Sequence, residues 1–208
     1  MISLKKFLNS IRSVDDNLKF SRKFINTLLI LLFGIVMGIL SKWFDNLDII
    51  FLDLGNFFSD IAIWLFIAIC ISIYSKTPIR AGLNVFLFFI GMTISYHLST
   101  IIFNYFNPVT YMKIWYTLTI LSPFLAYVVW YAKSDNKYSI IINSLILFVM
   151  FSYCFSIGQW YLFFKGSILY MLIFIGTCIV LFKKSNIMIY SMLIGLVLSF
   201  IIRLPLFS

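Results

Sequence analysis

Residues 24–44 read FINTLLILLFGIVMGILSKWF, an apolar run whose single charged residue, Lys42, stands near its end. A helix that crosses a lipid bilayer needs about 20 mostly apolar residues, so this stretch is long enough to cross. Six further apolar stretches follow it, at 61–75, 81–103, 114–132, 138–158, 167–182 and 187–207. The sequence therefore predicts an all-α fold, a polytopic transmembrane helical bundle of about seven spans.

The composition of the whole chain agrees with this interpretation. Hydrophobic residues make up 62% of the 208 residues and charged residues only 11%, whereas a soluble domain carries about 25% charged residues. The net charge is +9, but the basic residues separate the apolar runs and do not gather on one polar stripe, as they do in nucleic-acid binders. We therefore expect a membrane protein and no nucleic-acid partner.

Basic residues also predict the orientation of the chain, because cytoplasmic loops are enriched in Lys and Arg. If the chain has seven spans, connectors rich in basic residues alternate with connectors that carry few. The rich connectors are then cytoplasmic, which places the N-terminus inside and the C-terminus outside. The first outer connector, 45–60, is too apolar for a free loop and is expected to lie along the outer interface or partly re-enter the membrane. The basic residues on the cytoplasmic side are Lys5, Lys6, Arg12, Lys19, Arg22, Lys23, Lys76, Arg80, Lys133, Lys137, Lys183 and Lys184; those on the outer side are Lys42, Lys113, Lys165 and Arg203.

Residues 1–23 are expected to form a cytoplasmic amphipathic segment ahead of a transmembrane domain at 24–208. Its basic residues lie opposite an apolar face, which is typical of a helix in the membrane interface that contacts an anionic inner leaflet. A frayed cytoplasmic tail is the alternative. The apolar residues at helical spacing are Leu4, Phe7, Leu8 and Ile11.

The third apolar stretch is the richest in polar residues, and it contains the single histidine, His97. Counted from Pro78 in the turn before it, Asp60 lies 18 residues back (78 − 60) and His97 lies 19 residues on (97 − 78). Paired antiparallel helices would place both side chains at one depth, so we expect them to interact. The alternatives are that Asp60 caps its own helix and that His97 bonds across the bundle.

These residues suggest a ligand-binding cavity that opens to the outer leaflet between the second, third and fourth spans. Pro123 lies in the middle of the fourth span, where it removes a hydrogen bond from the carbonyl of Thr119, and the side chains of Ser122 and Thr119 are the two candidates to satisfy the exposed groups. The expected polar lining of the cavity is Asp60, Ser95, His97 and Ser99, and its expected aromatic walls are Trp64, Tyr96 and Trp115.

Gly34 and Gly38 form a GxxxG pattern in the first span, with Ser41 close to the same face. Small residues at this spacing let two helices approach closely. We expect this face to pack against another helix, either within the chain or in a partner membrane protein.

Three classes of function remain, in this order. The first is a small non-enzymatic protein of transport or ligand-binding type in the plasma membrane of a bacterium; the second is an accessory or immunity protein that acts through helix contacts; the third is an intramembrane hydrolase. No catalytic residue can be named. One histidine and three cysteines without a CxxC pair indicate neither a metal site nor a cofactor.

Overall fold

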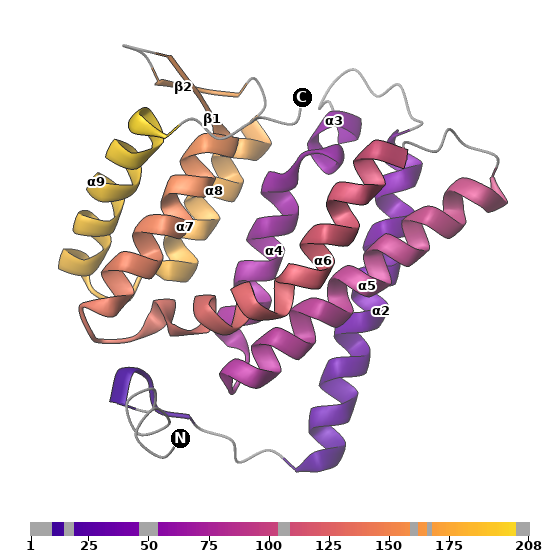
Figure 1. Cartoon of the computed structure of the whole chain (residues 1–208), viewed down its shortest axis with the longest axis horizontal. Coiled ribbons are helices and arrows are strands. Elements are labelled where there is room, and N and C mark those ends of the chain that lie inside the picture. Colours follow the sequence, from indigo (N-terminus) through magenta and orange to yellow (C-terminus); the bar gives the residue numbers. More distant parts are fainter. Residues whose placement is uncertain are drawn as a thin grey trace.

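The computed structural model describes residues 10–14, 19–45, 54–103, 109–158, 162–165 and 168–202. In this part of the chain three helices are long and apolar enough to cross a membrane. They are α2 (Phe20–Asp45), α5 (Pro78–Ile102) and α6 (Val109–Val129), which continues into the 3₁₀ turn η1 (Trp130–Lys133). The chain is therefore a helical protein with the character of a membrane protein, and Figure 1 shows these helices leaning across one another on one side of the molecule.

Four shorter apolar helices occupy the remaining apolar stretches. They contain 14 or 17 residues each, so their lengths alone do not confirm seven spans. Three of them stand side by side at the other side of the bundle (Figure 1). Their bounds are Ile61–Tyr74 for α4, Tyr138–Cys154 for α7, Ile168–Leu181 for α8 and Ser185–Ile201 for α9.

Two connectors carry structure of their own. Part of the first outer connector forms a short helix, α3 (Leu54–Ser59), directly before α4, while residues 46–53 lie outside the described residues. After α7 the chain turns into two short antiparallel strands, β1 (Phe155–Ile157) and β2 (Leu162–Phe164). The fifth apolar stretch was expected to be helical to residue 158, which is wrong: its last part is rich in β-branched and aromatic residues that favour a strand.

The ends of α4 and α5 follow the sequence pattern. The carboxylate of Asp60 accepts a hydrogen bond from the backbone N–H of Ala62 at 3.4 Å, and so it caps α4. Thr77 caps α5 by accepting from the N–H of Arg80 at 3.1 Å, and Pro78 fills the first turn. The expectation that Asp60 is an N-cap is therefore confirmed.

Helices α2 and α5 pack with their backbones almost in contact. A Cβ atom added to Gly34 would lie 2.2 Å from the carbonyl oxygen of Phe88, and one on Gly38 would lie 2.2 Å from Oγ of Ser95 and 2.3 Å from the carbonyl of Met92. The close packing expected of the GxxxG face is present, and its neighbour is α5 of the same chain.

Helices α7 and α9 pack through a similar row of small residues on α9, which was not predicted from the sequence. Ser191, Gly195 and Ser199 recur every four residues on α9, and all three are buried. The Ser191 hydroxyl donates to the carbonyl of Ile140 at 3.3 Å. A Cβ atom on Gly195 would lie 3.0 Å from Cβ of Leu147, so this interface is close but less tight.

The proline in α6 is accommodated as its sequence context predicts. Pro123 lies inside the helix, and the hydroxyl of Ser122 donates to the carbonyl of Thr119 at 2.8 Å, which replaces the hydrogen bond that the proline removes. A Cβ atom on Gly82 of α5 would lie 2.8 Å from the carbonyl oxygen of Pro123. The kink region is therefore also a point of close contact between α5 and α6.

The basic connectors meet at one end of the bundle. Arg12 donates to the carbonyl of Ile73 at 3.0 Å and to that of Trp130, and its guanidinium stacks 4.1 Å from the centre of the Trp130 ring. Arg80 donates to the carbonyl of Lys23 at 2.8 Å. Arg12 thus satisfies carbonyls at the ends of helices. The rest of the proposed amphipathic helix lies largely outside the described residues.

Candidate functional site

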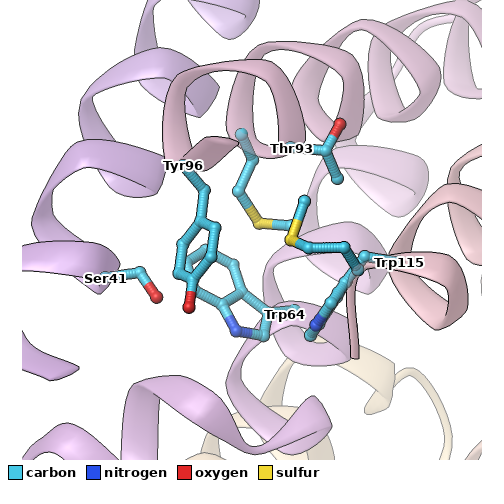
Figure 2. Close-up of a pocket in the computed structure, with 7 residues that line it drawn as sticks. Ser41, Trp64, Thr93, Tyr96 and Trp115 are labelled. Atoms are coloured by element: carbon cyan, nitrogen blue, oxygen red, sulfur yellow. The ribbon is translucent and has the colours of Figure 1, made fainter. Parts of the chain in front are cut away.

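A hollow of about 250 Å³, a volume that includes its open side, lies between α2, α4, α5 and α6. We call it the outer hollow, since it is near the end of the bundle opposite the basic connectors. Figure 2 shows side chains from these helices gathered around it. They are Ser41, Trp64, Met92, Thr93, Tyr96, Met112 and Trp115.

Most polar atoms of the outer hollow lie on one side of it, whereas the Thr93 hydroxyl points away from them (Figure 2). In Figure 2 the hydroxyls of Ser41 and Tyr96 and the indole nitrogens of Trp64 and Trp115 point the same way. The Trp64 indole donates to the carbonyl of Phe58 at 2.8 Å. The lining of the outer hollow is nevertheless almost wholly apolar, because its hydrogen-bonding side chains already have partners within the protein and the Met92 and Met112 thioethers contribute to the rest.

A charged cluster adjoins that polar side. The Tyr96 hydroxyl donates to one carboxylate oxygen of Asp45 at 2.7 Å, and the Ser59 hydroxyl donates to the other at 2.7 Å. The ammonium of Lys42 lies 5.0 Å from the centre of the Tyr96 ring. Lys42 is only 4% exposed, and a charge held out of water is costly unless other groups compensate for it.

A second hollow, which we call the inner hollow, lies between α4, α5 and α6 and has a volume of about 500 Å³ with its open side. It shares Trp64 and Trp115 with the outer hollow; the two rings stand edge to face with centres 6.1 Å apart. Its two hydroxyl groups, on Ser72 and Ser122, donate to carbonyls of their own helices. The inner hollow therefore presents an almost wholly apolar lining.

The structure brings together three of the seven residues that the sequence suggested for a site. Trp64, Tyr96 and Trp115 line the outer hollow. Ser95 and Ser99 are buried but line neither hollow. The Ser95 hydroxyl donates to the carbonyl of Met92 at 3.1 Å.

The expected interaction of Asp60 with His97 is wrong. Asp60 accepts a hydrogen bond from the Tyr170 hydroxyl at 3.0 Å and pairs with the Lys165 ammonium at 3.5 Å. Nδ1 of His97 is buried without a hydrogen-bond partner among the described residues. The depth obtained by counting residues assumes two antiparallel helices with aligned axes, but α5 runs obliquely away from α4 (Figure 1). The Asp60 carboxylate at the start of α4 instead contacts Tyr170 of α8 and Lys165, which follows β2.

Two residues that connect α2 to the outer hollow were not among those that the sequence suggested for a site. Lys42 and Asp45 stand three residues apart at the end of the first span, and Lys42 is the only charge within that run. A charge inside an apolar segment is a functional signal in membrane proteins. The sequence contained this signal, but Lys42 was interpreted only as one of the basic residues that indicate the orientation of the chain.

Comparisons of the chain with family models, with curated proteins and with solved structures found no match. Within the described ranges, no three His, Cys, Asp or Glu side chains come together in a group that could hold a metal ion.

Proposed function

We propose that this protein binds a small organic molecule in the outer hollow and serves in its capture or transport across the membrane. The observation that carries the proposal is the buried Lys42 and the Asp45 carboxylate beside that hollow, both in contact with Tyr96 of its lining. Membrane-protein interiors bear the cost of buried charge mainly where function requires it. Ligand sites are commonly apolar hollows with a few polar groups that fix orientation.

The same proposal includes seven membrane crossings with the N-terminus in the cytoplasm. It is supported by the way that basic connectors contact each other at one end: Lys183, between α8 and α9, donates to Asp135 at 2.7 Å and to the carbonyl of Lys133 at 3.2 Å. The 14 residues of α8 extend about 21 Å at 1.5 Å per residue. That is shorter than the bilayer core of about 30 Å. The hairpin of β1 and β2, which precedes the first turn of α8, supplies further apolar residues to make up the difference.

The other two classes of function have less support. Gly34 and Gly38, the residues that suggested a partner protein, contact α5 of the same chain. Asp60 and His97, the pair on which an intramembrane hydrolase would depend, do not bond to each other, and Asp60 contacts Tyr170 and Lys165 instead. We therefore base the proposal on ligand binding.

The test of ligand binding uses Thr93, which lines the outer hollow and whose hydroxyl donates to the carbonyl of Phe89 at 2.7 Å. The full-length protein is purified in its own lipids, and bound molecules are extracted and identified by mass spectrometry. Thr93→Met lengthens the side chain into the hollow, while Thr93→Val keeps its shape and serves as the matched control. We expect one compound to copurify with the wild type and the Thr93→Val variant and to be severalfold depleted in the Thr93→Met variant.

Equal recovery of every compound from all three proteins would contradict the proposal. The topology is tested separately, by a reporter fused after Ser208 that is active only in an exported compartment. Activity of a cytoplasmic reporter at the same position would exclude seven crossings.

A further inference from the structure

The inner hollow has an almost wholly apolar lining, and the protons of its two hydroxyl groups are already used within the protein. Its lining comes from α4, α5 and α6, and its two serines already donate to backbone carbonyls at 2.7 and 2.8 Å. A buried water needs two to four polar partners. The inner hollow therefore does not suit water, an ion or a polar metabolite.

The side of the inner hollow at α6 faces the apolar surface of the protein. Leu125 lines the hollow and is 55% exposed. Its neighbours Leu121, Phe124 and Val128 are also exposed apolar residues. Since α6 is long and apolar enough to cross a membrane, the medium at this surface is lipid hydrocarbon.

We propose that the inner hollow binds the hydrocarbon chain of a membrane lipid, which enters sideways between α4 and α6. An acyl chain needs no hydrogen bonds, and it supplies the dispersion contacts that the lining otherwise lacks. A chain in this position packs behind Trp64 and Trp115, which also wall the outer hollow, so lipid occupancy supports the shape of the outer hollow from behind.

The experiment uses full-length protein in phosphatidylcholine nanodiscs that contain a small fraction of a fatty acid with a diazirine group in the middle of its chain. After irradiation, labelled residues are located by mass spectrometry, with unlabelled oleate as competitor. We expect saturable, oleate-competed labelling at inner residues of the lining such as Leu65 and Leu118. Labelling confined to the outward-facing Leu121, Phe124 and Val128, rising in proportion to the probe, would overturn the inference.

Two variants fill the inner hollow or close it. Ala68→Phe places a ring inside the hollow, and Leu125→Trp covers its mouth from the exposed side, where a larger side chain does not disturb the core. Leu121→Phe, one turn away on the exposed surface, is the matched control. We expect labelling of the lining to fall severalfold in the first two variants and to stay unchanged in the third.

The outcome is separable from the test of the outer hollow. If the inner hollow takes no lipid but the proposed function holds, Ala68→Phe and Leu125→Trp leave labelling unchanged while Thr93→Met still loses the copurified compound. If the proposed function fails and this inference holds, the two filling variants lose labelling, whereas Thr93→Met recovers the same compounds as the wild type.

Discussion

The α2–α5 contact and the α7–α9 contact are both formed through small residues, but the two helices approach each other more closely in the first. Both carry small residues four apart on one helix. On α2, a Cβ atom at Gly34 would meet a backbone carbonyl at 2.2 Å, whereas on α9 a Cβ atom at Gly195 would meet the side chain of Leu147 and the carbonyl of Ser144, each at 3.0 Å. A carbonyl of a helix cannot move without the helix, but a contact at 3.0 Å is relieved by shifts of a few tenths of an ångström. The spacing of small residues therefore predicts that two helices pack closely, and the distance to the opposite backbone decides whether a larger side chain can be accommodated.

The closer contact is the one that holds the outer hollow. Ser41, which follows Gly38 by one turn, lines the hollow from α2, and Met92, Thr93 and Tyr96 line it from α5. Any separation of α2 from α5 would move these walls apart. The α7–α9 contact lies outside both hollows, so its loss should affect stability and spare ligand binding.

The largest effect is expected for Gly34→Ala. The added methyl group meets the carbonyl of Phe88, so α2 and α5 must separate, which costs about 1–3 kcal/mol or more of the free energy of unfolding. Denaturation of the purified protein in mild detergent measures this cost. We also expect loss of the compound that copurifies with the wild type; a Gly34→Ala variant of normal stability would show that the two helices are not in backbone contact.

An intermediate effect is expected for Gly82→Ala, in the contact between α5 and α6. The added Cβ atom would lie 2.8 Å from the carbonyl of Pro123, and α6 can yield there because its helix already lacks one hydrogen bond. We expect a destabilisation of about 1–2 kcal/mol by the cost of overpacking, measured in the same denaturation assay. A cost equal to that of Gly34→Ala would mean that the proline gives α6 no freedom to adjust.

Gly195→Ala should have a smaller effect. The atoms nearest to the added Cβ atom lie at 3.0–3.1 Å and need to move by only a few tenths of an ångström, so we expect a loss below about 1.5 kcal/mol, as for modest changes in core volume. Ligand recovery should remain that of the wild type. If Gly195→Ala reduces ligand recovery as strongly as Gly34→Ala does, the two interfaces are coupled and the comparison between them fails.

The smallest effect is expected for Asp135→Asn, in the connector that precedes α7. Hydrogen bonds from Lys183 and Lys184 hold the pKa of the Asp135 carboxyl below its ordinary value. A depressed folded-state pKa stabilises the protein above the unfolded pKa, near 3.9, and this stabilisation is lost as the pH falls through the folded pKa. The thermal midpoint of the wild type should therefore fall slightly more than that of Asp135→Asn between about pH 6 and pH 3. Parallel curves would show that these exposed ion pairs contribute nothing.

The positions of the helices were predictable because hydropathy is a local property. The second apolar stretch was placed at 61–75 and α4 spans Ile61–Tyr74; the sixth was placed at 167–182 and α8 spans Ile168–Leu181. The hydrogen bond from Ser122 to Thr119 followed from the chemistry of proline, which is also local. The seven crossings were not confirmed, since length and composition qualify three helices.

The site was predictable only in part, because it depends on the direction in which each helix faces. Counting residues from Pro78 gave a depth for Asp60 and His97, but not the tilt of α5 or the approach of Tyr170 from α8. The aromatic walls were predictable because large rings near the ends of apolar helices usually lie either at the headgroup level or in the core. Lys42 and Asp45 were missed because their roles depend on Tyr96, which lies more than 50 residues away in sequence.

The unequal helices also have a consequence for the lipids around the protein. The 26 residues of α2 extend about 39 Å and the 14 residues of α8 about 21 Å. A protein that crosses the bilayer with both has a different hydrophobic thickness on its two sides, and the bilayer accommodates this mismatch by thinning beside the short helices while the long helices tilt. Lipids with short chains would then gather along α7, α8 and α9, and neighbouring proteins with short spans would be drawn to that side. If the short helices cross the bilayer as proposed, the annulus of lipid around the protein would be sorted by helix length, independently of what either hollow binds.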